Sequence, residues 1–220
     1  MKMKIIVKIF LFWIFFVGIG VPTYAQTSTE LTEKEKNQLT RRIEDKLEDF
    51  LVYLGELASK TLSDEIREMA YESNLSLFIG NCEPYKVIDL YSGKEQWKDA
   101  VKMQTSSVNS SEPPKQQTMK EYFYKLRNNM LPYTDIIIEQ SGAVRVDNIR
   151  QVGPNKFEGV AHYFQIFAGY MDKRLIYKDR TEKSVKVYID SNYNETSDGL
   201  QLIYDIKLGD MKVRSTERVY

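Results

Sequence analysis

The stretch from Lys156 to Met171, read KFEGVAHYFQIFAGYM, constrains the fold more than any other part of the chain. It is a long run of aromatic, small and apolar residues, and the turn sequence Gly153-Pro154-Asn155 precedes it. The run is much longer than a usual strand of about five or six residues. It is therefore predicted to be a central strand of a sheet, in which Gly159 and Gly169 form bends or bulges that curve the sheet.

The two faces of this strand differ less than those of a strand that is buried on one side only. Alternate residues point to opposite faces of a strand, which gives one face Phe157, Gly159, Ala161, Tyr163, Gln165 and Phe167 and the other Val160, His162, Phe164, Ile166, Ala168 and Tyr170. Both sets are largely apolar or aromatic. We therefore expect helices to cover one face and a ligand or partner to cover the other.

The first 25 residues have the pattern of a secretory signal peptide. Lys2, Lys4 and Lys8 form a basic start, residues 9–21 form an apolar core, and Thr23-Tyr24-Ala25 supplies small residues before a cut after Ala25. An uncleaved membrane anchor is the rival, but the apolar segment is shorter than the roughly 20 residues of a span. The prediction is an exported protein, periplasmic or secreted, with a polar lead over 26–32 and a single domain over 33–220.

Charge and composition exclude several classes of protein. The chain holds 31 basic and 31 acidic residues, and loss of the three leader lysines leaves the mature chain weakly acidic, which disfavours nucleic-acid binding. Cys82 is the one cysteine and His162 the one histidine. The chain can form no internal disulfide, Cys82 is expected to be a small buried residue, and no metal or cofactor is predicted. No further segment of the mature chain is apolar enough to span a membrane.

Helical patterns occupy the first half of the chain. A capping box at Thr32 and Glu35 precedes an apolar stripe and predicts a helix over 33–58, carried by Leu39, Ile43, Leu47, Phe50, Leu54 and Leu57. Thr61 or Ser63 caps a second helix that ends near Asn74. A short strand is expected over 75–79, paired with 85–91.

The middle of the chain is predicted to be less regular. Residues 94–103 are expected to form one or two helical turns, with Trp97 and Val101 facing inward. Residues 104–117, rich in Ser, Thr, Asn and Pro, are interpreted as a loop insertion within the domain. A second capping box at Thr118 and Glu121 starts a helix that ends before Pro132.

Strand patterns fill the rest of the chain. Strands are predicted over 134–139, 144–152, 156–171, 175–178 with 184–189, and 200–208. Asp172-Lys173-Arg174 is expected to be a polar corner, residues 190–199 a polar turn, and Gly209-Asp210 a bulge.

This order of elements resembles the NTF2-like (SnoaL-like) superfamily. The resemblance rests on the second helix running into a short strand, Arg67-Glu68-Met69-Ala70 through Leu77-Phe78-Ile79, and on the long strands after Leu131. The chain also resembles exported proteins of unknown role from Bacteroidetes-type bacteria. The resemblance implies an α+β, NTF2-like cone over about 33–216, in which N-terminal helices pack on a curved antiparallel sheet.

Enzymes of that superfamily often use a His–Asp or Tyr–Asp pair inside the cone, and this resemblance implies His162 with Asp205, or Tyr163 with Asp205, as candidate pairs. Each residue also has a purely structural interpretation. A satisfied or edge histidine accounts for His162, and a solvated pair at a strand end accounts for Asp205 and Asp210. No residue is therefore assigned a catalytic, cofactor-binding or metal-binding role.

Two compositional features of the second half have several interpretations. A basic run interleaved with acids is interpreted as a solvated strand edge, with an anionic ligand or a lipid surface as the alternatives; it comprises Lys173, Arg174, Lys178, Arg180, Lys183 and Lys186. Tyrosine is frequent, 15 of 220 residues, which suits a core with hydroxyls at its rim, a pocket lining or an interface.

The functional prediction is an exported, non-enzymatic binding or protein-interaction module of the bacterial periplasm or envelope. Its expected partner is a small apolar ligand or an envelope protein. One alternative is a small NTF2-like lyase, isomerase or hydrolase acting in the cone pocket, and another is a structural subunit of an envelope assembly. An enzyme needs polar residues that converge in a pocket, whereas an assembly subunit needs an exposed apolar patch.

Overall fold

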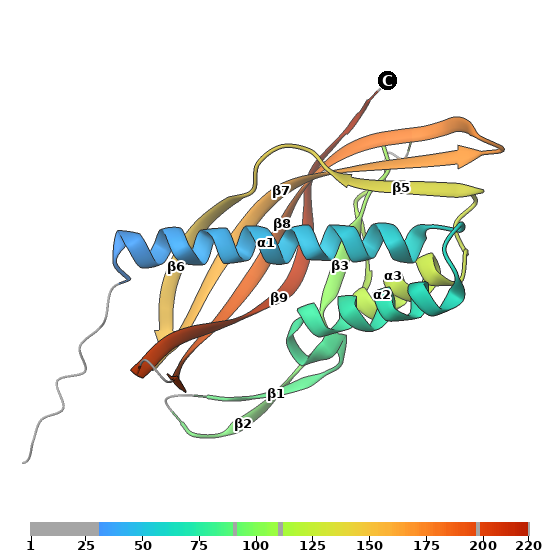
Figure 1. The fold of residues 1–220 in the computed structure, drawn as a ribbon. Helices are drawn as coiled ribbons and strands as arrows, with labels where there is room; N and C mark the ends of the chain where they lie inside the picture. The colour runs from blue at the N-terminus through green and yellow to red at the C-terminus, as the bar shows by residue number, and fades with distance from the viewer. Residues whose placement is uncertain (1–30, 90–91, 110–111, 197–198, 220) are drawn as a thin grey trace, which may run out of the picture.

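Helices lie against the concave face of one strongly bent sheet (Figure 1). The computed structural model describes residues 31–89, 92–109, 112–196 and 199–219. Within these ranges the helices are α1 (Glu33–Ala58), α2 (Asp64–Leu77) and α3 (Met119–Arg127), and a short 3-10 helix, η1 (Ile79–Cys82), follows α2. The α+β class, with N-terminal helices packed on a mostly antiparallel sheet, is confirmed.

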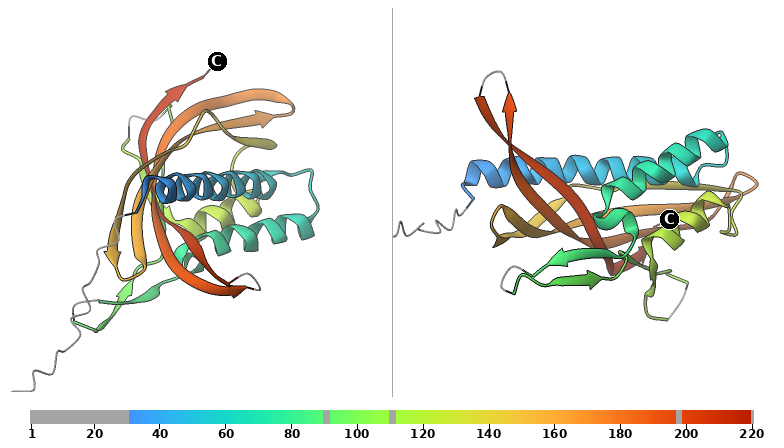
Figure 2. Two further views of the ribbon diagram at one scale, coloured as in Figure 1. Left: turned by 60° about the vertical axis from the view of Figure 1, so that its left-hand side comes forward. Right: turned by 90° about the horizontal axis from the view of Figure 1, so that it is seen from below.

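The large sheet has seven strands, and its order is β4-β3-β9-β8-β7-β5, with β6 also paired to β7. The strands are β3 (Lys102–Thr105), β4 (Lys115–Thr118), β5 (Asp135–Gln140), β6 (Arg145–Gly153), β7 (Lys156–Met171), β8 (Arg174–Thr196) and β9 (Gly199–Arg218). All pairings are antiparallel except that of β3 with β9. Figure 2 shows these strands curling around α1.

The first helix has the bounds that its sequence predicts. Thr32 accepts a hydrogen bond from the Glu35 amide, and Glu35 accepts one from the Thr32 amide, so the capping box is formed. The whole predicted apolar stripe is buried under the sheet. Because an amphipathic helix gains most of its stability from such packing, α1 forms the centre of the core.

The second helix is longer than predicted, and the strand expected over 75–79 is wrong. Ser63 caps α2, which continues through Leu77 because Ala70, Asn74 and Leu77 share its buried face. The chain then turns at Gly80 and Asn81, both at positive φ. Phe78 makes only an isolated bridge to β9.

The predictions for residues 85–103 are also corrected. Residues 85–88 pair not with 75–79 but with the next strand, as β1 (Tyr85–Ile88) and β2 (Glu95–Lys98) of a separate hairpin. No helical turn forms over 94–103, because residues 95–98 and 102–105 are strands. Val101 is buried as predicted, but Trp97 is 69% exposed. A short hairpin has no second layer over its outer face, so the aromatic side chain stays in solvent.

The predicted loop over 104–117 is narrower in the structure. Its two ends belong to β3 and β4, which pair with each other at the edge of the sheet. Val101 precedes this hairpin, and its carbonyl accepts a hydrogen bond from the Met119 amide at 2.8 Å. The hairpin therefore leads directly into α3, whose capping box at Thr118 and Glu121 is formed as predicted.

Strand β7 has the predicted bounds and lies inside the sheet, although it is next to the edge rather than central. It pairs along its whole length with β8 on one side, and on the other with β6 and β5 in turn. The pairing with β8 shifts register between Gly169 and Tyr170, but the extra residue is Ile176, so the bulge is in β8 rather than at Gly169. A Cβ placed on Gly169 would lie 2.4 Å from Cδ1 of Tyr133, so glycine is needed for this close approach.

Strands β8 and β9 extend beyond their predicted ends. The polar turn expected over 190–199 is mostly strand, because β8 continues to residue 196 and β9 begins at residue 199. Residues 197 and 198 lie outside the described residues. The predicted bulge at Gly209-Asp210 is confirmed by the register, which pairs Val185 with Met211 but Val187 with Leu208.

Buried Arg67 joins the carboxyl ends of two helices. Its Nε donates to the carbonyl of Leu57 at 3.3 Å, and its Nη2 donates to the carbonyls of Leu126 and Arg127 and to Oδ1 of Asn129. The last carbonyls of a helix have no partner within the helix. One guanidinium therefore satisfies the ends of both α1 and α3 and fixes α3 against the core.

The predicted signal peptide and most of the polar lead, residues 1–30, lie outside the described residues. No helix between residues 31 and 219, in the ranges that the structure describes, is both long and apolar enough to cross a membrane.

Candidate functional site

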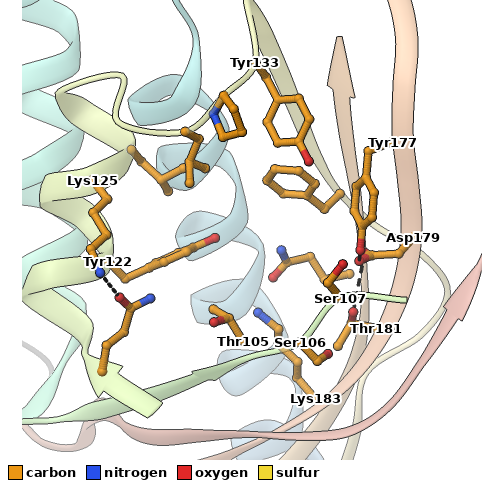
Figure 3. Close-up of a pocket in the computed structure, with 16 residues that line it drawn as sticks. Thr105, Ser106, Ser107, Tyr122, Lys125, Tyr133, Tyr177, Asp179, Thr181 and Lys183 are labelled. Atoms are coloured by element: carbon orange, nitrogen blue, oxygen red, sulfur yellow. Dashed lines mark hydrogen bonds between the residues drawn. The ribbon is translucent and has the colours of Figure 1, made fainter. Parts of the chain in front are cut away.

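A cavity of about 250 Å³ lies between α3 and the floor of the sheet. Figure 3 shows its walls: Tyr122 and Lys125 come from α3 on one side, and Tyr177, Asp179, Thr181 and Lys183 come from β8 on the other. Residues 131–133, which follow α3, and residues 105–107, at the end of β3, complete the lining. Both faces of the cavity thus come from segments far apart in the sequence.

The polar floor of the cavity follows from the alternation of β8. Alternate residues of a strand point to the same face. The concave face of β8 therefore carries Asp179, Thr181 and Lys183 as well as Val185, Val187 and Ile189. Helix α1 covers the apolar half of this series, and the cavity lies over the polar half. One face of a single strand therefore contributes to the core and then to a site.

The interpretation of the basic run as a solvated strand edge is wrong for its second half. From Asp179 onward along the run, β8 lies between β7 and β9 and has no free edge, whereas Arg174 to Lys178 precede the ladder with β9. Lys178, Arg180 and Lys186 are on the outer face, but Lys183 points inward and is 4% exposed. The sequence carried a usable signal, because the same alternation that buries Val185 and Val187 also buries Lys183.

Asp179 is the centre of a hydrogen-bond network. Its carboxylate accepts a hydrogen bond from the Tyr177 hydroxyl and a long one, 3.5 Å, from Oγ1 of Thr181. The Thr181 oxygen in turn lies 3.2 Å from Oγ1 of Thr216, which bonds Ser106. Since Thr181 donates to the carboxylate, it can only accept from Thr216, and the hydroxyl chain is polarised toward Asp179.

The pKa values of this network are shifted by burial. Burial raises the pKa of Asp179, whereas the Tyr177 hydrogen bond and the charge of Lys183 oppose that rise. Burial, followed by the hydrogen bond to Asp179, raises the pKa of Tyr177 to about 12. Tyr177 is therefore a neutral donor, and the tyrosine also accepts a hydrogen bond from the Val108 amide at 3.3 Å.

Lys183 is the most unusual group in the cavity. Burial lowers its pKa to about 7, although the charge of Asp179 opposes the shift. Within the described parts of the chain, its Nζ forms neither a hydrogen bond nor an ion pair within 4 Å. A buried ammonium without direct partners pays a large desolvation cost, so near neutral pH a substantial fraction of Lys183 is the free amine.

Gln165 supplies a second buried polar atom without a partner within the described ranges, its amide oxygen. Its side chain lines the cavity from β7, it is 4% exposed, and its Oε1 has no hydrogen-bond partner in the described structure. The ladder places Gln165 opposite Thr181, one diagonal step from Lys183. At that spacing long side chains on one face of a sheet can meet the same molecule.

The remaining wall of the cavity is apolar. Leu126, Leu131 and Pro132 form one side of it. Tyr133, Phe167 and Tyr177 form an aromatic cluster, with ring centroids 5.7 to 6.3 Å apart. The cavity therefore offers an apolar enclosure with a few buried polar groups on its floor, which is the usual composition of a small-molecule site.

The structure separates the residues that the family resemblance pairs. His162 is on the outer face of β7, where its Nε2 lies 3.5 Å from Oδ2 of Asp147. Asp205, on β9, is exposed and pairs with Asp190 of β8. This position is far along the strand from the β9 residue that is aligned with His162 across β8. Tyr163 is buried beneath the helices and donates to Sδ of Met211 at 3.4 Å. Neither pair forms.

Two further candidates have structural roles. Asp210 accepts a hydrogen bond from the Lys102 amide at 2.8 Å and so holds β3 to β9. Cys82 is buried, as predicted, and burial raises the pKa of its thiol to about 12. Tyr163 and Gln165 are buried, so the face of β7 that they share is covered, as expected. On the outer face, the guanidinium of Arg180 stacks 3.7 Å from the ring centroid of Phe164.

Comparisons of the chain with protein-family models, with curated proteins and with solved structures found no match. A functional assignment therefore rests on the geometry of the cavity.

Proposed function

We propose that this protein binds a small amphipathic molecule in the cavity between α3 and the floor formed by β7 and β8. The observation that carries the proposal is the presence of two buried polar groups, the ammonium of Lys183 and the amide oxygen of Gln165, that line the cavity without direct partners among the described residues. An unpaired buried polar group costs about 1–3 kcal/mol. A ligand that pairs with both groups recovers that free energy on binding.

The cavity defines the kind of ligand. Its 250 Å³ equals the volume of roughly eight water molecules, which suits a compound the size of a single ring or a short chain. The apolar body lies against the aromatic cluster and Leu131, and the polar head lies on the floor. That head accepts a hydrogen bond from Lys183 and donates one to Oε1 of Gln165. A purely apolar ligand would leave both groups unpaired, so the ligand has a polar end.

We further propose that the binding takes place outside the cytoplasm, after removal of the first 25 residues, and that the domain is NTF2-like. The basic, apolar and small-residue segments before Ala25 support export. Helices on the concave face of a bent, mostly antiparallel sheet, with a cavity between the two layers, support the NTF2-like assignment. Fold alone does not define the ligand.

Ligand binding can be tested by native mass spectrometry of protein purified from its source, followed by thermal-shift screening of ring-sized alcohols, acids and amides. We expect to find a bound or stabilising compound. Its affinity should fall at least about tenfold in Gln165→Leu, because the partner of its polar head is lost. Lys186→Met is the control, since Lys186 lies on the outer face of the neighbouring strand β8, away from the cavity. Binding that is unchanged in Gln165→Leu, or that is weakened equally by the control, would place the ligand elsewhere and contradict the proposal.

A further inference from the structure

We infer that Lys183 is a nucleophile, and that the small molecules held in this cavity include aldehydes or ketones that form a reversible imine with its Nζ. The inference rests on the proposed function, because it names the chemical class of the molecule that occupies the same cavity. It adds a covalent step that simple binding does not need.

The position of Lys183 is what an imine-forming lysine requires. The side chain comes from an interior strand with its backbone hydrogen-bonded on both sides, so its attachment is rigid. It is nine-tenths buried, it lines the cavity, and no carboxylate within 4 Å holds it as an ion pair in the parts of the chain that are described. A desolvated lysine in such surroundings is present partly as the free amine, which is the reactive form.

The step is balanced without any further reactant. The nitrogen lone pair of the neutral amine attacks the carbonyl carbon, and a proton moves from nitrogen to oxygen to give a carbinolamine. Its hydroxyl then takes up a proton from solvent and leaves as water, while the nitrogen lone pair forms the carbon–nitrogen double bond of a protonated imine; water reverses the reaction and releases the proton. No electrons are gained or lost, so the step needs no oxidant, reductant or cofactor.

Two neighbours favour this chemistry. The carbinolamine carries a hydroxyl that the free carbonyl compound lacks, and Oε1 of Gln165 is a buried acceptor in need of a donor. A group that pairs only with the intermediate lowers the barrier rather than merely strengthening binding. The protonated imine keeps the positive charge of the lysine, and the buried carboxylate of Asp179, on the same face of β8, balances that charge.

Other lysines lack this combination. Lys125 also lines the cavity, but its Nζ donates to Oε1 of Gln117 at 2.5 Å. Lys186 is on the outer face and lies 3.0 Å from Glu158. Lys156 is exposed and paired with Asp190, and Lys102 is half-buried and paired with Asp99. A selective reaction at Lys183 is therefore the distinguishing expectation.

The test uses the folded chain with heptanal or benzaldehyde and sodium cyanoborohydride at pH 6.5, followed by intact-mass measurement and peptide mapping. Saturable labelling is expected at Lys183, more than about a hundredfold faster than at an exposed lysine, because an ordinary lysine is almost wholly protonated at that pH. Lys183→Arg keeps the charge and should abolish the fast labelling, whereas Lys186→Arg should leave it unchanged. Labelling spread evenly over the exposed lysines would overturn the inference.

The corresponding alcohols, 1-heptanol and benzyl alcohol, separate this inference from the proposed function. They fill the cavity but cannot form an imine, and their binding is measured by calorimetry. If the alcohols bind but the aldehydes leave no label at Lys183, the imine is ruled out and the binding function stands. If neither the alcohols nor the aldehydes bind or react, both proposals fail for this class of ligand.

Discussion

Asp179 and Lys183 project from the same face of β8 into one cavity, with Thr181 between them, and each is 4% exposed. They attract each other through the cavity without a direct ion pair, and the charge of each opposes the pKa shift that burial gives the other. Two buried charged groups that form no direct ion pair recover little of their desolvation cost. The native fold therefore holds free energy in this cavity that a ligand can release.

Lys183 should make the stability of the protein rise with pH above neutrality. The pKa of Lys183 is about 7 in the folded chain and about 10.4 in an unfolded one. Between these values the unfolded chain binds the extra proton, so the free energy of unfolding increases as pH rises. Lys183→Met should remove up to about 3 kcal/mol of that increase between pH 7 and pH 9.5, measured by urea denaturation.

The comparison with Lys183→Met isolates this one group, because Asp179, Tyr122 and Lys125 face the cavity in both chains. Lys186→Met, on the outer face, should retain the wild-type slope. An identical pH dependence in wild type and Lys183→Met would mean that Lys183 stays charged in the folded protein, contrary to the shift described above.

Replacement of Arg67 should be among the most damaging single changes. Arg67→Met leaves the terminal carbonyls of α1 and α3 without donors, at an expected cost of about 3 kcal/mol or more. The urea midpoint of Arg67→Met reports that cost. Arg41→Met on the exposed side of α1 should change the free energy of unfolding by less than about 0.5 kcal/mol. Equal midpoints for the two variants would show that the guanidinium does not stabilise the helix ends.

Gly169→Ala should destabilise the fold much more than Gly159→Ala on the same strand. The new methyl group at residue 169 would meet the Tyr133 ring at 2.4 Å, whereas at residue 159 it would lie 3.3 Å from Cγ1 of Ile149. Overpacking of the first kind costs about 1–3 kcal/mol, and the second contact is relieved by a small shift. Denaturation curves of both variants provide the measurement.

A second substitution shows whether the Tyr133 ring is the cause. Tyr133→Leu should be destabilising in the wild-type background. In the Gly169→Ala background it should be less destabilising, or neutral, because there it also removes the clash between the Tyr133 ring and the new methyl group. Additive effects of the two changes would point to a different origin for the loss.

Cys82 should be inert in the native protein. Burial raises the pKa of the thiol to about 12 from its ordinary value near 9, so the thiolate fraction at pH 8 falls about a thousandfold. Ellman's reagent should give no native reaction over minutes and full reaction with one thiol per chain in 8 M urea, a standard denaturing concentration. Rapid labelling before unfolding would show that the segment after α2 opens locally.

The parts of the fold that were predictable have local causes. The capping boxes at Thr32 and Thr118 and the helical stripe of α1 define two helix starts, and the turns at Asn155 and Asp172 define both ends of β7. The strand over 75–79, its pairing and the helical turns over 94–103 were wrongly predicted because the periodic signals of these segments are weak: Leu77 fits a helix as well as a strand. Their structure is decided by packing against distant segments, which local patterns do not report.

The site was missed for a different reason. Lys183 was grouped with its basic neighbours, although alternation places it with Val185 and Val187 on the inner face. Asp179 and Thr181 follow the same rule. Sequence could therefore have identified a polar, inward-facing segment of β8. It could not have identified the opposite wall, because Tyr122 and Lys125 reach the cavity only through the docking of α3, which depends on Arg67.

The pairing of β3 with β9 governs when the cavity can form during folding. Lys102 and Asp210, joined at 2.8 Å, close a loop of 108 residues, and such a contact carries a high entropic cost that delays it relative to the hairpins between β6 and β9. We therefore expect the wall made by residues 105–107 to be added late, onto a sheet that already exists. A newly synthesised chain would pass through a state whose floor, including Lys183, is still open to water. A ligand that arrives early could then be enclosed as the last strands join, rather than having to enter a finished cavity.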